Sequence, residues 1–195
     1  VWVVVIAASY VLGTFPTAIL VGRRKGVDPT KQGSGNPGAT NMYRTAGKKA
    51  GALVLVGDVL KGVIAAGAGW IIDDRRLAML CWAAAVVGHI FPVFRKFRGG
   101  KGVATAGGGV IVLFWYVAAI CIVIFIATIK LTKRGSIGSL VISIAVPSLA
   151  AAFGRPGWEV GIACGVCGVV ILRHWSNIKR LLSGKEAAVV GRAAQ

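Results

Sequence analysis

Residues 103–129 read VATAGGGVIVLFWYVAAICIVIFIATI and contain no charged side chain. A transmembrane helix needs about 20 mainly apolar residues, so this stretch is long for one span and short for two. The aromatic run Phe114-Trp115-Tyr116 lies near its middle. Aromatic side chains gather at membrane interfaces, which favours a turn at this point and two crossings.

Five other apolar stretches accompany it, and they are interrupted by only a few titratable residues. The chain is 56% hydrophobic and 15% charged, whereas soluble domains carry about 25% charged residues. This composition excludes an ordinary soluble domain, a disordered chain and a coiled coil. The other stretches are 1–22, 51–72 (with Asp58 and Lys61), 77–94 (with His89), 135–154 and 156–172 (with Glu159).

The chain has 23 basic and six acidic residues, and the basic ones stand in blocks between the apolar stretches. In a soluble protein this balance would indicate nucleic acid binding, but here the cations flank membrane spans. Basic loops remain in the cytoplasm. If residues 103–129 cross once, the basic residues divide evenly between the two sides. If they cross twice, all basic residues lie inside except Arg75, Arg76, Arg155 and Lys61.

We therefore predict an all-α integral membrane protein with seven transmembrane helices, the two within residues 103–129 being short. The N-terminus is expected outside and the C-terminus in the cytoplasm. Residues 1–195 are expected to form a single polytopic domain. Its cytoplasmic loops that carry motifs are 23–50, 95–105, 130–136 and 173–186.

The first of these loops contains GSGNPGATN, residues 33–41, shortly before Arg44. Glycine permits backbone shapes in which successive N–H groups converge on one oxyanion, usually phosphate. Composition alone equally allows a plain flexible loop, and the Lys-Ser/Thr ending of a Walker A loop is missing. The candidate anion-binding residues are Ser34, Gly35, Asn36, Gly38, Thr40, Asn41 and Arg44.

The second loop reads FRGGKGVAT, residues 97–105, and again joins glycines to cations. Ordinary positive-inside charge explains the cations, but neither the glycines nor the threonine. The segment RHWSNIKR, residues 173–180, adds a histidine and an amide on the same side, or else is a basic amphipathic helix lying on anionic lipid. Together the segments indicate a site for two anionic groups, with candidates Lys101, Gly102, Thr105, His174 and Asn177.

Other titratable groups have two interpretations each. Asp58 and Lys61 share one helix face, and charges within a span cost about 3 kcal/mol each, so they form either a functional pair or a structural ion pair. His89 is either a hydrogen-bonded core residue or a catalyst. Cys164-x-x-Cys167 fits small residues packed between helices better than a redox pair or metal site. A site rich in anion-binding groups and poor in bases suits substrates already activated by phosphorylation.

Four blocks of sequence together resemble the bacterial acyl-phosphate:glycerol-3-phosphate acyltransferases of the PlsY type. Their order and spacing match from about residue 8 to residue 186. The weakest stretch is 106–160, where only hydropathy and Ser139 after a basic turn support the match. The blocks are SGNPGATN (34–41), GDVLKG (57–62), GHIFPVF (88–94) running on to GGKGVAT (99–105), and RHWSNIKRLL (173–182) with Gly184 and Glu186.

The resemblance implies transfer of a fatty acyl group from acyl phosphate to the 1-hydroxyl of sn-glycerol 3-phosphate, at the cytoplasmic face of the bacterial cell membrane. The products would be 1-acyl-glycerol 3-phosphate (lysophosphatidic acid) and phosphate, an early step of phospholipid biosynthesis. It implies no cofactor, no metal and no nucleic acid. The partners would be the two substrates and membrane lipid, with the oligomeric state open and a monomer allowed.

The resemblance also implies roles for the candidates. The loop at 34–41 would cradle the acyl phosphate, while Lys101 and Arg44 would neutralise the two phosphates. The acyl chain would lie in a groove open sideways to the bilayer. The expected catalytic residues are Lys101, Ser34, Thr40, Asn41 and His174, and the expected substrate-binding residues are Gly35, Asn36, Gly38, Arg44, Lys61, His89, Gly102, Thr105, Ser139 and Asn177.

Two other classes of protein remain open. A transporter or channel for an organic phosphate would use the same loops as an anion filter. It predicts charged residues along several spans, yet only Asp58 and Lys61 lie deep, and no internal repeat is visible. A non-catalytic membrane scaffold gives no reason for the sequence SGNPGATN.

Overall fold

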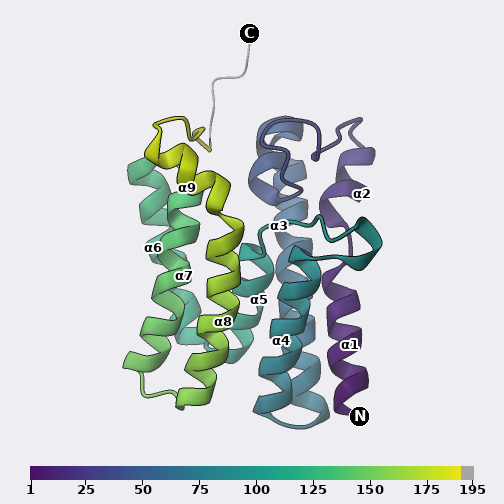
Figure 1. Cartoon of the computed structure of the whole chain (residues 1–195), viewed down its shortest axis with the longest axis vertical. Helices are drawn as coiled ribbons and strands as arrows, with labels where there is room; N and C mark the ends of the chain where they lie inside the picture. The colour runs from purple at the N-terminus through teal and green to yellow at the C-terminus, as the bar shows by residue number, and fades with distance from the viewer. Residues whose placement is uncertain (190–195) are drawn as a thin grey trace.

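The computed structural model describes residues 1–189, which fold into helices joined by short connections (Figure 1). Five segments are long and apolar enough to cross a membrane, and the pair α8 and α9, bent by 56°, would be a sixth. This confirms the prediction of an all-helical membrane protein. The helices are α1 (Trp2–Gly13), α2 (Thr17–Arg23), α3 (Ala39–Ile72), α4 (Arg75–Ile90), the 3-10 turn η1 (Val93–Arg95), α5 (Val103–Leu113), α6 (Trp115–Thr132), α7 (Gly135–Ala152), α8 (Gly157–Arg173) and α9 (Trp175–Leu182).

The stretch 103–129 divides into two helices at the predicted place. Phe114 separates α5 from α6 with φ −144° and ψ 59°, which belong to neither helix. The expectation of two short helices was wrong for the second: α5 has 11 residues, but α6 has 18. The reason is that α6 continues through Lys130, whose long side chain can reach polar surroundings without ending the helix.

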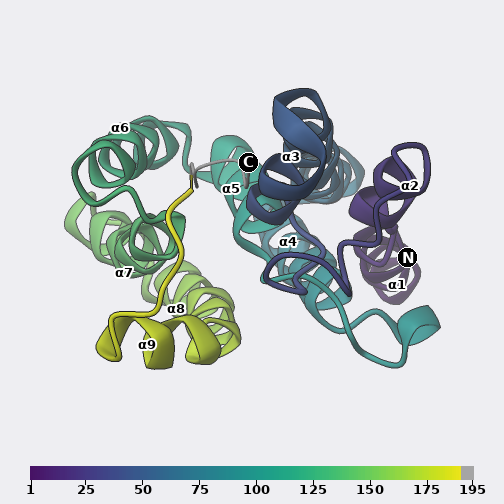
Figure 2. The ribbon, with the colours of Figure 1, turned by 90° about the horizontal axis from the view of Figure 1, so that it is seen from above.

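The helices form two groups (Figure 2). In the first, α1 packs on α4, and α3 packs on α4 and α5. In the second, α6, α7 and α8 pack in sequence order. The groups meet where α4 contacts α8 and where α5 passes into α6. The apolar core crosses this junction and includes the buried side chains of Trp82, Phe114, Val117, Ala150 and Ala163.

The connections lie at two ends of the molecule (Figure 1). One end carries the loop between α2 and α3, the turn between α6 and α7, and helix α9. The opposite end carries the N-terminus, the α3–α4 turn and the α7–α8 turn. The loop between α4 and α5 passes beside α1 and α2 at the edge of the molecule and then returns to the start of α5, which lies below the first end (Figures 1 and 2).

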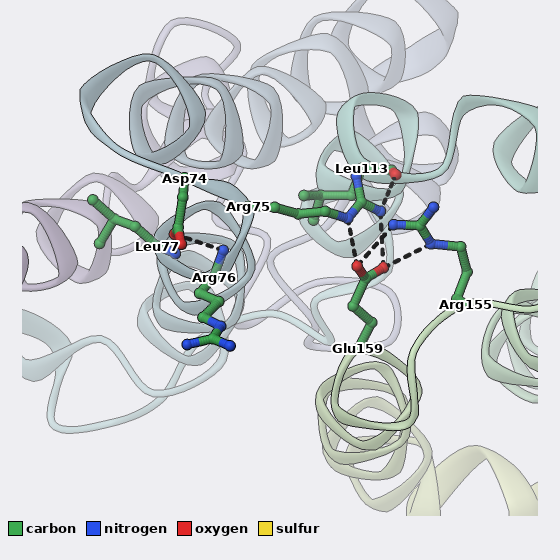
Figure 3. Close-up of polar contacts among 7 residues, drawn as sticks. All are labelled: Asp74, Arg75, Arg76, Leu77, Leu113, Arg155 and Glu159. Carbon is green, nitrogen blue, oxygen red and sulfur yellow. Dashed lines mark hydrogen bonds and ion pairs between the residues drawn. The ribbon is translucent and has the colours of Figure 1, made fainter.

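At the opposite end two arginines share one buried carboxylate (Figure 3). Glu159 is 1% exposed and accepts hydrogen bonds from Arg75 at 2.6 and 2.9 Å and from Arg155 at 2.8 and 2.7 Å. Arg75 also donates to the carbonyl of Leu113 at 2.6 Å. Both guanidinium groups lie near the ring of Phe114, 5.0 and 5.8 Å from its centroid. The cluster joins the two groups of helices where α5 turns into α6.

Candidate active site

A cleft of about 530 Å³ lies between the two groups of helices. The start of α3, the loop before α5 and the residues around α9 form its polar end, while apolar side chains of α5 to α8 form its other walls. The structure thus brings together segments far apart in the sequence. Most predicted site residues line this cleft: Ser34, Asn36, Gly38, Thr40, Asn41, Arg44, His89, Lys101, Gly102, Ser139, His174 and Asn177.

Three predicted residues are not part of the cleft wall. Gly35 has a φ of 70° and shapes the loop beside Ser34. Lys61 is 4% exposed and forms a buried ion pair. Thr105 is fully buried, and its backbone lies so close to α3 that a Cβ on Gly62 would be 2.0 Å from its carbonyl oxygen. The backbone of Thr105 therefore packs against α3, while its buried hydroxyl has no hydrogen-bond partner among the described residues.

Asn41 holds the first glycine-rich loop in shape. Its side-chain oxygen accepts from the backbone N–H of Ser34 at 2.9 Å, and its side-chain nitrogen donates to the carbonyls of Pro29 at 2.9 Å and Gln32 at 3.0 Å. Gly33 has a φ of 62°, and a Cβ there would lie 2.2 Å from the oxygen of Asn41. The amide is thus occupied within the loop, so the structure gives Asn41 an ordering position.

The same loop leads into α3, whose first turn has no side-chain cap. The first N–H groups of a helix have no intrahelical partner and carry partial positive charge. Gly38, Ala39 and Thr40 line the cleft, so these groups lie at its polar end. Arg44, one turn further, adds a fixed cation, and its Nη2 donates to the carbonyl of Ala187 at 3.0 Å. The start of α3 is therefore suited to hold an oxyanion.

The second glycine-rich loop rests on the end of α4. The N–H groups of Gly99 and Gly100 donate to the carbonyls of Ile90 and His89, each at 3.1 Å. A Cβ on Gly100 would lie 2.2 Å from Nε2 of His89, so only glycine fits against the imidazole ring. The next residue is Lys101, whose position therefore depends on this contact.

A buried ion pair supports that histidine from α3. Nζ of Lys61 donates to Oδ1 of Asp58 at 2.7 Å, and the same oxygen lies 3.7 Å from Nδ1 of His89. The three side chains are 4%, 3% and 8% exposed, in that order. They form a continuous polar support from α3 through α4 to the loop that carries Lys101.

Hydrogen bonds connect Lys101 to the C-terminal segment. Its Nζ donates to Oδ1 of Asn177, and Nδ2 of Asn177 donates to Glu186 at 2.6 Å. The other oxygen of Glu186 accepts from Nε of Arg180 at 2.7 Å. Sequence reasoning placed Glu186 in a matching block but missed it as a site residue, although one acid in a basic segment was a usable signal.

The polar end of the cleft favours anions. Burial lowers the pKa of the Lys101 ammonium to about 8; Glu186 opposes this shift, and Arg180, Arg44 and Arg173 add to it by repulsion. An anion entering beside these cations would stabilise their charged forms. The polar end is therefore suited to bind anions.

His174 and Ser139 complete the polar end from α8 and α7. His174 is 2% exposed, and its Nδ1 lies 2.8 Å from the carbonyl of Val170. This contact assigns the Nδ1 proton in the neutral ring and leaves Nε2 as an acceptor. The hydroxyl of Ser139 donates to the carbonyl of Gly135 at 3.0 Å, so its lone pairs are left to accept.

The apolar part of the cleft ends within the molecule and opens to its side. The lining residues farthest along the helices from the polar end are Ile111, Ala118, Val146 and Cys167, and buried core residues follow on the next turns. Several lining residues are also strongly exposed, which places an opening between α3 and α6. These are Leu55 (48% exposed), Ile111 (42%), Ile122 (51%) and Ile126 (49%).

The two cysteines of the CxxC sequence face different surroundings. Cys164 is exposed on α8, whereas Cys167 is buried in the cleft wall, and both thiols are free. In residues 1–189 no three His, Cys, Asp or Glu side chains gather as ligands for a metal ion.

The sequence and the structure were compared with known proteins. The family model described as glycerol-3-phosphate acyltransferase matches residues 3–184. The glycerol-3-phosphate acyltransferase of Desulforudis audaxviator is 41% identical over 187 residues, covering 95% of this chain and 94% of the relative. That of Syntrophomonas wolfei is 38% identical over 185 residues, covering 94% and 95%.

Solved structures agree with these matches. The crystal structure of the integral membrane glycerol 3-phosphate acyltransferase PlsY in its glycerol 3-phosphate form has a TM-score of 0.90 at 35% identity, covering 97% of this chain and 96% of that one. The lysophosphatidic acid form has a TM-score of 0.87 at 35% identity, covering 96% and 94%. Because the match extends over nearly the whole chain, this protein belongs to the glycerol-3-phosphate acyltransferase family of integral membrane enzymes.

Proposed function

We propose that this protein transfers a fatty acyl group from acyl phosphate to the 1-hydroxyl of sn-glycerol 3-phosphate, releasing 1-acyl-glycerol 3-phosphate and phosphate. The observation that carries the proposal is the cleft, which joins a cation-rich polar end to an apolar groove open at the side. Two phosphate-bearing substrates, one with a long acyl chain, fit this combination. The ligands named for the two PlsY forms, glycerol 3-phosphate and lysophosphatidic acid, support the acceptor and the product.

The polar end offers a place for each phosphate. The N–H groups at the start of α3, with Ser34 and Thr40, hold the acyl phosphate. Ser139, His174 and Asn177 hold glycerol 3-phosphate. Lys101 and Arg44 stand beside both groups and neutralise their charge, which is the main obstacle to bringing two phosphates together.

The reaction needs little chemistry from the protein. Acyl phosphate is a mixed anhydride, so its acyl group already carries a good leaving group. The 1-hydroxyl oxygen attacks the acyl carbon, the bond to phosphate breaks, and the hydroxyl proton passes to a phosphate oxygen or to Nε2 of His174. The site residues therefore act by positioning the substrates and by stabilising negative charge.

The groove takes the first part of the acyl chain. His174, which caps the C-terminal end of α8, lies two turns from Cys167, which is about 10 Å of helix. An acyl chain in one leaflet extends about 15 Å, half of the hydrocarbon core. The far end of the chain leaves between α3 and α6 and stays in the lipid.

We infer further that the single domain crosses the bacterial cell membrane seven times. The segments α1 with α2, then α3, α4, α5, α6, α7 and α8 cross in turn, with the N-terminus outside and the motif loops in the cytoplasm. The distribution of basic residues supports this orientation. The short α5 is covered by protein, since α3, α4 and α6 pack against it.

The test is an assay of the purified, detergent-solubilised protein for phosphate and lysophosphatidic acid. Palmitoyl phosphate with glycerol 3-phosphate should give both products, and palmitoyl-CoA should give neither. Product from palmitoyl-CoA alone would overturn the donor assignment. No product with either donor, from folded protein, would favour a carrier of organic phosphate, which liposome flux would then measure.

A further inference from the structure

Helix α9 has an outer face that the described residues 1–189 leave uncovered. Trp175 is 59% exposed and Leu182 is 85% exposed, and Leu172 at the end of α8 is 72% exposed. Nζ of Lys179 lies over the indole ring of Trp175, 5.6 Å from its centroid. An apolar edge bordered by lysines is the pattern of a helix that lies in the interface of an anionic bilayer.

The inner face of the same helix belongs to the active site. Asn177 is 4% exposed and bonds to Lys101 and Glu186, while Arg180 bonds to the other oxygen of Glu186. Because α9 is a short continuous helix, its outer face and Asn177 move together. Its axis bends by 56° from α8, so α9 lies across the top of its group of helices (Figure 1).

Charge complementarity identifies the surface that covers α9. Lys179 on α9 and Lys185 three residues after it are both exposed, and the whole chain has a net charge of +17. One lysine near an anionic membrane surface contributes about 1 kcal/mol, equivalent to about fivefold in the attraction. Lipid headgroups with a net negative charge supply this complement, and their acyl chains accept Trp175 and Leu182.

We propose that α9 is an interfacial helix seated on anionic phospholipid, and that this seating holds Asn177 against Lys101, so that acyl transfer increases with the anionic lipid content of the membrane. The inference rests on the proposed function, because its first test measures acyl transfer. In this proposal the lipid surface is a further ligand, and its binding to α9 fixes the position of Asn177 relative to Lys101. A protein partner on the same face would not respond to lipid charge.

The first experiment compares vesicles of phosphatidylcholine with vesicles that also contain phosphatidylglycerol, using the full chain. Wild-type kcat/KM for glycerol 3-phosphate should be severalfold higher in the anionic vesicles. Lys179→Gln with Lys185→Gln should lose most of this ratio and keep the activity seen in phosphatidylcholine. The matched control, Lys48→Gln with Lys49→Gln, removes the same charge from exposed positions of α3 and should keep the wild-type ratio.

A second measurement does not depend on activity. The fluorescence of Trp175, obtained as the difference between wild type and Trp175→Phe, should be quenched by brominated lipids, and more strongly in anionic vesicles. An unchanged activity ratio in the α9 variant, an equal loss in the control, or an unquenched Trp175 would each overturn the proposal. If no vesicle supports acyl transfer, the proposed function fails, while quenching still decides where α9 lies.

Discussion

At the scale of single residues, Lys101 is the side chain on which most of the site depends. It is the cation of the second glycine-rich loop, and its Nζ donates a hydrogen bond to Asn177. Lys101→Ala should lower kcat/KM at least a hundredfold, because removal of one preorganised charge partner costs about 3 kcal/mol in the transition state. Expression and thermal stability should be retained. Arg98→Ala, at an exposed position of the same loop, is the control and should change little.

The same lysine predicts a pH dependence. Burial places its pKa near 8 in the free enzyme, so the charged form dominates below that pH and is lost above it. The logarithm of kcat/KM should therefore fall as the pH rises through about 8, whereas kcat should fall only at higher pH, because bound phosphate stabilises the ammonium. In Lys101→Arg the alkaline fall should disappear. If kcat/KM of this variant still falls near pH 8, the fall is caused by the titration of another group.

Residue types in the sequence drew attention to many residues that line the polar end of the cleft, but they did not show what each side chain contacts there. Asn41 was expected to be a donor to substrate, yet its amide is occupied by three backbone groups that only the folded loop brings together. Thr105 follows a glycine-rich loop, but it is fully buried and its backbone lies in the α3–α5 contact. Glu186 gains importance from Asn177 and Arg180, which lie on another element.

At the scale of elements, α3 supports the catalytic loop through its ion pair. Removing one partner of a buried pair costs about 3–5 kcal/mol, whereas replacing both is often neutral. Asp58→Asn and Lys61→Met should each lower the unfolding temperature, and the double variant should recover most of it. Activity should stay low in the double variant, since His89 has lost its acidic neighbour. Thermal unfolding in detergent and kcat/KM measure the two effects; stability losses that simply add would contradict the pairing.

The contact between the loop and α4 makes a separate prediction. Gly100→Ala would place a Cβ 2.2 Å from His89, so the loop must shift and carry Lys101 with it. Activity should fall at least tenfold with little loss of stability, as compared by kcat/KM and thermal unfolding. Gly67→Ala provides the control, because no atom lies within 4 Å of its Cβ. Equal effects of the two substitutions would contradict this role for the loop.

The boundaries of helices could be predicted where the polarity of the sequence changes sharply along the chain. The aromatic residues around Phe114 marked the division between α5 and α6 because interfaces attract aromatic rings. The length of α6 was not predictable from the loss of apolar character at Lys130, since a lysine stem can stay in a helix while its ammonium leaves the lipid.

At the scale of the whole molecule, the cleft exists because two groups of helices meet only along part of their length. The Arg75–Glu159–Arg155 cluster and the core around Phe114 close one end, and Lys101 with Asn177 bridges the other. Spacing within a sequence does not show which distant segments face one another. That α3 and α5 face α8 and α9 across the cleft could therefore be seen only in the structure. The membrane-spanning segments and the polar loops could be predicted from the sequence.

The closed end of the cleft predicts how the enzyme selects acyl chains. Catalytic efficiency should increase with donor length until the enclosed groove of about 10 Å is filled, and then become constant, because further carbons lie in lipid. Ala118→Phe fills the closed end, where the native side chain is 6% exposed. This variant should prefer short acyl phosphates over palmitoyl phosphate by about tenfold or more relative to wild type.

Val123→Phe, on α6 at a position 67% exposed, is the control and should leave the preference unchanged. The measurement is the ratio of kcat/KM for short and long donors, which a general loss of stability would not alter. A preference that keeps rising with chain length in wild type would mean that the whole chain is enclosed and that the opening between α3 and α6 is closed during the reaction.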